Sequence, residues 1–66
     1  MNTDQIKGKW RQIKGAAKSE WGKLTDDDLS VIEGDAEKLI GKIQERYGIA
    51  REDAKARVDA WSPPAA

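Results

Sequence analysis

The side chains that most enzymes use for acid–base and nucleophilic chemistry are scarce in this sequence. Its 66 residues include no histidine and no cysteine, which removes the commonest general base and the strongest nucleophile. The serine and threonine hydroxyls have no identifiable activating base. We therefore expect a protein without enzyme activity, and we assign it no catalytic residue and no cofactor site.

An acidic run that begins at Asp26 offers the best match to a metal site. Counted from this residue, Asp28, Ser30 and Glu37 fall at the third, fifth and twelfth positions of a calcium-binding loop. The sixth position requires glycine for its sharp turn, but Val31 stands there. The run also fits the start of a helix better than a loop, so we expect no metal site.

Four basic residues recur at helical spacing near the start of the chain. Steps of four, three and four residues place them on one helix face, and we call them the basic stripe: Lys7, Arg11, Lys14 and Lys18. Such a stripe suits a nucleic acid, an anionic membrane, an acidic protein surface or self-association. It is also typical of an ordinary solvated face. The protein-wide net charge of zero argues against a nucleic-acid-binding domain, so the partner and the oligomeric state stay open.

The charges are segregated along the chain although they cancel overall. Residues 1–25 carry six basic and two acidic side chains, a net charge of +4, whereas residues 26–66 carry a net charge of −4. Segments of opposite sign attract each other within a folded hairpin or between two molecules. Compensation within one molecule is the simpler interpretation.

The basic stripe lies on a segment that predicts a helix over residues 4–23, capped by Asn2 or Thr3. Apolar residues recur along this segment at steps of three and four: Ile6, Trp10, Ile13, Ala17, Trp21 and Leu24.

A seven-residue repeat places three glycines on the opposite face of this helix: Gly8, Gly15 and Gly22. Each glycine lowers helix stability by about 1 kcal/mol relative to alanine. The face is simply solvated, or is approached closely by another backbone, or belongs to a helix that forms fully only when docked. The third glycine lies near the helix end, where a turn with positive φ is an alternative.

Local signals predict three further helices. Thr25 and Asp28 form a capping box for a short helix that ends near Gly34. A helix over residues 35–47 follows, with Gly48 as its left-handed cap. The last helix spans residues 51–61, and its spacing predicts two ion pairs, Glu52 with Lys55 and Asp53 with Arg57. The residues expected to be largely buried are Trp10, Ile13, Leu24, Leu39, Ile43 and Val58.

The chain is long enough for one domain, which we place at residues 1–61, followed by a flexible tail at residues 62–66. No apolar run approaches the ~18 residues of a membrane helix. The N-terminus lacks the basic start and apolar centre of a signal peptide. A cytoplasmic protein without a transmembrane segment is the default expectation.

Four segments together resemble the CsbD-like family of small bacterial stress proteins. Residues 6–15 (IKGKWRQIKG) and 21–29 (WGKLTDDDL) resemble the start of that family, and residues 32–34 (IEG) and 39–48 (LIGKIQERYG) resemble its second half. The resemblance covers about residues 4–61.

The resemblance implies an all-α fold, a small four-helix bundle of two helical hairpins similar in outline to SAM-like domains. It also implies a bacterial cytoplasmic protein of the general stress response, with no catalytic or ligand residues to transfer. We therefore expect a non-enzymatic protein that acts by macromolecular binding or protection. Nucleic-acid binding through the basic stripe is the alternative.

Overall fold

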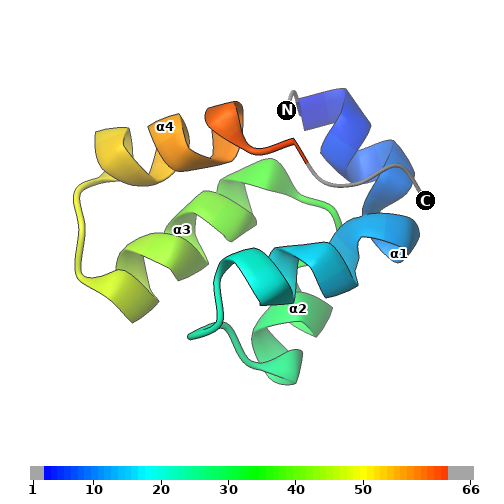
Figure 1. Cartoon of the computed structure of the whole chain (residues 1–66), viewed down its shortest axis with the longest axis horizontal. Helices are drawn as coiled ribbons and strands as arrows, with labels where there is room; N and C mark the ends of the chain where they lie inside the picture. The colour runs from blue at the N-terminus through cyan, green and yellow to red at the C-terminus, as the bar shows by residue number, and fades with distance from the viewer. Residues whose placement is uncertain (1–2, 63–66) are drawn as a thin grey trace.

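A computed structural model describes residues 3–62 of the chain, and within that range it contains four helices and no strand. They are α1 (Thr3–Glu20), α2 (Asp26–Ile32), α3 (Ala36–Tyr47) and α4 (Arg51–Ala60) (Figure 1). The expected all-α bundle is confirmed.

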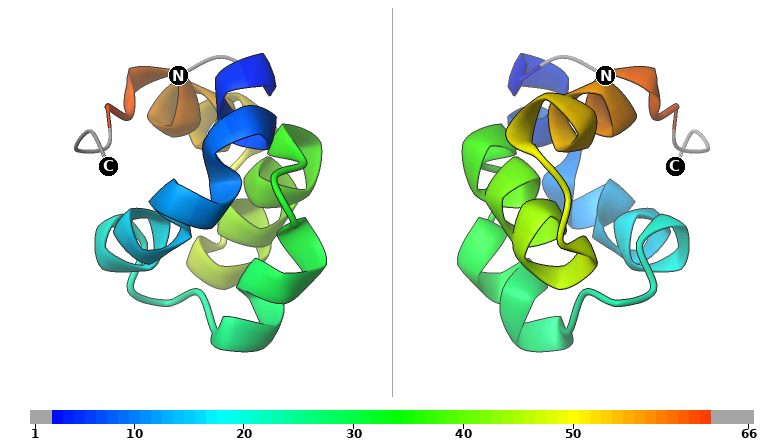
Figure 2. Two further views of the ribbon diagram at one scale, coloured as in Figure 1. Left: turned by 90° about the vertical axis from the view of Figure 1, so that its right-hand side faces the viewer. Right: turned by 90° about the vertical axis from the view of Figure 1, so that its left-hand side faces the viewer.

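Helix α3 lies at the centre of the bundle and contacts each of the other three helices. Views from the two sides show α1 in front on one side, and the turn between α3 and α4 with the adjoining ends of both helices in front on the other (Figure 2). The apolar faces of all four helices meet in one core. All the residues expected to be buried are indeed buried: Trp10, Ile13, Leu24, Leu39, Ile43 and Val58.

Helix α1 is shorter than its apolar spacing predicted, because it ends at Glu20 and not at Lys23. The chain then turns, with the Trp21 amide donating to the Ala17 carbonyl at 2.9 Å and the Leu24 amide donating to the Trp21 carbonyl at 2.9 Å. Both Trp21 and Leu24, which flank this turn, lie in the core. The predicted cap at Thr3 is also wrong, since Thr3 is already in the helix; Asn2 lies outside the described residues.

The predicted caps of α2 and α3 are largely confirmed. The Thr25 hydroxyl accepts from the Asp28 amide, and the Asp28 carboxylate accepts from the Thr25 amide, both at 3.0 Å. Gly48 ends α3 with a φ of 63°. The end of α2 differs from expectation, because Glu33, with a φ of 45°, is the left-handed cap, and Gly34 follows it with a φ of 83°.

Helix α4 ends at Ala60, one residue earlier than predicted, and Trp61 caps it. The Trp61 ring packs edge-on against Trp21, with ring centroids 4.9 Å apart. The two ion pairs predicted for α4 are not among those of the described residues. Lys55 instead pairs with Asp59 one turn later, at 2.9 Å, and the Arg57 guanidinium lies over the Tyr47 ring, 5.9 Å from its centroid. The predicted tail lies outside the described residues from Pro63 onward.

Candidate binding groove

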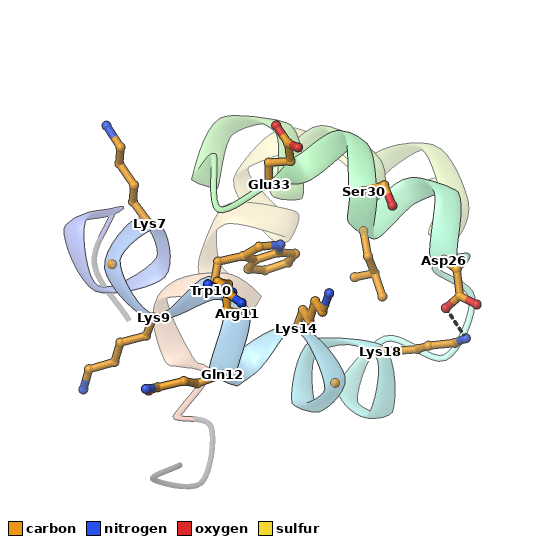
Figure 3. A pocket seen from close by; sticks show the side chains of 13 residues that line it. Lys7, Lys9, Trp10, Arg11, Gln12, Lys14, Lys18, Asp26, Ser30 and Glu33 are labelled. Atoms are coloured by element: carbon orange, nitrogen blue, oxygen red, sulfur yellow. Dashed lines mark hydrogen bonds and ion pairs between the residues drawn. The ribbon is translucent and has the colours of Figure 1, made fainter.

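Helices α1 and α2 form a hairpin that is joined at both ends and open between them. At one end, the Lys18 ammonium pairs with the Asp26 carboxylate at 2.6 Å. At the other end, Gly34 lies so close to α1 that a Cβ on it would be 3.1 Å from the Lys7 Cα and the Trp10 Cβ. The space between these contacts is a groove of about 1060 Å³, which we call the α1–α2 groove (Figure 3).

All four residues of the basic stripe line this groove: Lys7, Arg11, Lys14 and Lys18. Lys18 is held in its exposed pair with Asp26. The other three form no ion pair with any residue in the described range 3–62. Figure 3 shows Arg11 and Lys14 on the stretch of α1 that faces α2. Three of the four positive charges on this wall of the groove are therefore not neutralised by direct contact with any described residue.

The floor of the groove is apolar. Trp10 and Leu29 both line it, and each is only 7% exposed. The indole of Trp10 extends from α1 toward α2 in Figure 3. Both residues belong to the hydrophobic core, so the floor of the groove is the outer edge of that core.

The glycines of the seven-residue repeat do not all behave as the repeat suggested. Gly8 and Gly15 line the groove on α1, and a Cβ on either would have no atom within 4 Å. Gly22 lies beyond the end of the helix, and its φ is not positive. Close backbone approach occurs instead at Gly34, which the repeat did not include.

The α2 wall of the groove carries the opposite charge. Asp26, Ser30 and Glu33 line it. The hydrogen bond from Lys18, reinforced by its charge, lowers the pKa of the Asp26 carboxyl, and the more distant charge of Lys14 acts in the same direction. The groove is therefore polarised across its width, with cations on α1 and carboxylates on α2.

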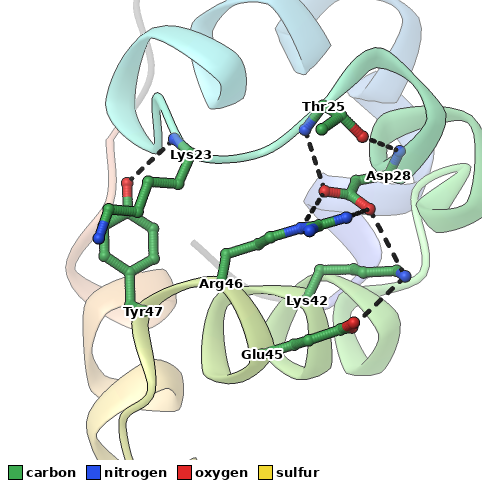
Figure 4. A network of polar contacts seen from close by, with 7 residues as sticks. All are labelled: Lys23, Thr25, Asp28, Lys42, Glu45, Arg46 and Tyr47. Carbon is green, nitrogen blue, oxygen red and sulfur yellow. Dashed lines mark hydrogen bonds and ion pairs between the residues drawn. The ribbon is translucent and has the colours of Figure 1, made fainter.

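A second polar cluster lies between α2 and α3 and is structural. Asp28 is only 2% exposed, and its carboxylate accepts from Arg46 Nε at 2.8 Å and from Arg46 Nη2 at 2.9 Å (Figure 4). Lys42 Nζ lies 3.5 Å from the same carboxylate. These contacts, first the hydrogen bonds from Arg46 and then the Thr25 amide, hold the pKa of Asp28 far below its usual range.

Sequence reasoning found only half of this cluster. The capping box identified Asp28 and Thr25, but nothing local indicated that Arg46, eighteen residues away, would bind the same carboxylate. The one available signal was the four-residue spacing of Lys42 and Arg46 on α3, which places two cations on one helix face. A carboxylate buried against them is a natural counterion.

The described residues hold no group of three or more histidine, cysteine or acidic side chains placed to bind a metal ion. The stretch compared with a calcium loop is helical from Asp26 to Ile32, so its carboxylates do not converge as loop ligands do. Among the described residues, no helix is long and apolar enough to cross a membrane.

Comparison with known proteins gives consistent matches over most of the chain. Residues 4–56 match the family described as CsbD-like. A UPF0337 protein of Pectobacterium atrosepticum is 59% identical over 61 residues, which cover 92% of this chain and 88% of that protein. The UPF0337 protein YjbJ of Escherichia coli K12 is 52% identical over the same shares. A UPF0337 protein of Pseudomonas aeruginosa is 55% identical over 94% of this chain and 95% of its own length.

Proposed function

The chain belongs to the CsbD-like family, and from that premise we propose that it is a non-enzymatic stress-response protein of the bacterial cytoplasm. It acts by binding other macromolecules, and the α1–α2 groove is the surface that it uses.

One observation carries this proposal: Lys7, Arg11 and Lys14 line the groove without an ion pair to any described residue. The net charge of zero does not argue against it, because the charge is segregated along the chain and residues 1–25, which include the basic side of the groove, carry a net charge of +4. The unpaired positive charge on α1 is therefore available to an acidic partner.

The dimensions of the groove favour a macromolecular partner. Its volume of about 1060 Å³ slightly exceeds the roughly 300–1,000 Å³ of small-molecule pockets. The stripe from Lys7 to Lys18 extends over about 16 Å of helix. A row of charges of that length matches an extended or helical segment better than a single compact ligand.

The buried carboxylate also supports a non-enzymatic role. A general acid or base works best when its pKa lies near the working pH. Arg46 instead keeps Asp28 ionised, and both oxygens of the carboxylate are occupied by hydrogen bonds. The group serves to join α2 to α3.

A survival assay tests the proposal. Replacing Lys7, Arg11 and Lys14 together with glutamine removes the unpaired charge from the groove while keeping side-chain length. We expect cells with this variant to survive stress as poorly as cells without the protein. The matched control replaces Lys38 and Lys55 with glutamine; both are exposed and neither lines the groove, so cells with this variant should survive like wild type. Unchanged survival with the groove variant, at equal protein abundance and helix content, would contradict the proposal.

A second candidate function is nucleic-acid binding by the same groove. It is favoured by the three cations of the basic stripe that pair with no described residue, since phosphates are bound by such groups. Binding to a labelled oligonucleotide should then weaken with salt, with a log–log slope of about −2 to −3 for three phosphate contacts. No binding at low salt would remove this candidate.

A further inference from the structure

The residues that line the α1–α2 groove carry an excess of positive charge. Five of them are basic and two, Asp26 and Glu33, are acidic, so their net charge is 5 − 2 = +3. Asp26 is already paired with Lys18. A partner of complementary charge is therefore an anion, whereas a second copy of the same groove would be repelled.

The negative charge of this partner should lie along one edge only. The α1 wall presents the three cations of the basic stripe that pair with no described residue. The α2 wall presents Asp26, Ser30 and Glu33, and Glu33 also forms no ion pair with a described residue. Anionic groups are attracted to the first wall and repelled from the second. The edge of the partner that faces α2 is therefore expected to be uncharged.

The floor and the ends of the groove restrict the shape of the partner. Trp10 and Leu29 form an apolar floor, where a phosphate would lose hydration without gaining a hydrogen bond. The Lys18–Asp26 pair joins α1 to α2 at one end, and the close contact of Gly34 joins them at the other (Figure 3). A rigid rod longer than the groove, such as a peptide helix or a duplex, would rest on these joints. A flexible strand can instead project flat side groups between them.

Single-stranded nucleic acid combines these properties. Its phosphates follow one edge, and its bases are flat, uncharged groups whose edges form hydrogen bonds. We propose that the α1–α2 groove binds a single strand of nucleic acid, with the phosphates along the basic stripe and the bases directed between α1 and α2. This inference rests on the proposed function and on its nucleic-acid candidate, to which it adds the strandedness and the orientation of the ligand.

A duplex fits the groove less well for an electrostatic reason. Phosphates follow both edges of each of its grooves, so a duplex that touches both walls brings one phosphate row to the basic stripe. The other row then approaches the α2 wall, where Glu33 is exposed and without an ion pair to a described residue. One repulsion between unit charges about 4 Å apart in water lowers affinity by about fivefold. The groove should therefore prefer a single strand.

Fluorescence anisotropy with labelled, unstructured oligonucleotides of about 12 nucleotides tests this preference. At about 50 mM salt, a single strand should bind about fivefold more tightly than its duplex. Changing Lys7, Arg11 and Lys14 to glutamine should abolish this binding, whereas changing Lys38 and Lys55 to glutamine should not. DNA and RNA strands are compared in parallel. Tighter binding of either strand than of its duplex supports the inference, and the ratio of their affinities identifies the preferred sugar.

Charge reversal on α2 tests the orientation of the strand. Glu33→Lys should raise the affinity for the duplex about fivefold more than the affinity for the single strand, because the second phosphate row then meets a cation. Asp27→Lys is the matched control, since it makes the same charge change at an exposed position of α2 that does not line the groove. It should leave the ratio of the two affinities unchanged. Both variants should keep the helix content of the wild type by circular dichroism.

Three results would overturn the inference: tighter binding of the duplex, equal effects of the two α2 substitutions, or no binding of a single strand at about 50 mM salt. A polyglutamate peptide separates this failure from that of the proposed function. If the peptide shifts the amide signals of α1 and the single strand does not, the inference fails while the groove remains a binding site for acidic protein. If neither probe binds, the proposed function fails as well.

Discussion

Arg46 donates hydrogen bonds to both oxygens of the buried Asp28 carboxylate, from its Nε at 2.8 Å and from its Nη2 at 2.9 Å. This pair joins the start of α2 to the end of α3. Because Asp28 also closes the capping box with Thr25, one side chain sets both the start of α2 and its position against the centre of the bundle. The α2 wall of the groove therefore depends on it.

Replacing Asp28 with asparagine should destabilise the protein. The change removes the charge that two Arg46 hydrogen bonds require and leaves a weaker acceptor at a site that is only 2% exposed. We expect the free energy of unfolding to fall by about 2–3 kcal/mol, measured by urea denaturation at neutral pH. The neighbouring and exposed Asp27 is the matched control, and its change to asparagine should have little effect. Equal effects of the two substitutions would contradict a special role for Asp28.

The same pair predicts how stability depends on pH. The pKa of Asp28 is lowered in the folded protein, so the unfolded chain takes up a proton there first as the pH falls. The stabilisation is complete above the unfolded pKa of about 4 and is lost as the pH falls toward the folded value. The difference in stability between wild type and Asp28→Asn should therefore narrow below about pH 4, by at most about 1.4 kcal/mol per pH unit. A constant difference between neutral pH and about pH 2 would contradict the assignment.

The glycines of α1 should be replaceable with a gain in stability. Gly8 and Gly15 lie within the helix, and a Cβ on either would meet nothing within 4 Å. Alanine at each position should raise the free energy of unfolding by about 1 kcal/mol. Gly22 lies outside α1 and should give no such gain. Thermal melts of the three single variants check this. Destabilisation by Gly8→Ala or Gly15→Ala would contradict a helical position with open space beside it.

Gly34 should respond in the opposite direction. Its φ of 83° is strained for alanine, and the added Cβ would lie 3.1 Å from the Lys7 Cα. We expect Gly34→Ala to lower the free energy of unfolding by about 1–3 kcal/mol. The substitution should also push the end of α2 away from α1, which amide chemical shifts of Lys7 and Trp10 would report. An unchanged free energy of unfolding together with unchanged amide chemical shifts would contradict the close contact between Gly34 and α1.

The sequence was informative where structure depends on neighbouring residues. The capping box at Thr25 and Asp28 and the left-handed cap at Gly48 follow from local chemistry, and both are confirmed. The basic stripe followed from helical spacing, and its four residues do line one groove. Its function was not predictable in the same way, because spacing does not reveal which charges are paired.

Contacts between segments that are distant in the chain could not be predicted from the sequence. No pattern linked Asp28 to Arg46. The repeat of Gly8, Gly15 and Gly22 did not include Gly34, the glycine at which α1 packs closely. The end of α1 was misplaced for a similar reason. The apolar spacing continues through Leu24, but the chain satisfies it by turning after Glu20.

The most direct test of the central claim, that the α1–α2 groove binds macromolecules, is photocrosslinking in stressed cells. A benzophenone amino acid at Ser30, which lines the groove, is compared with one at Val31, which is exposed but is not a lining residue. The account predicts crosslinked products from the Ser30 position, few from the Val31 position, and loss of the former when Lys7, Arg11 and Lys14 are changed to glutamine. No products from Ser30, or equal yields from the two positions, would contradict it.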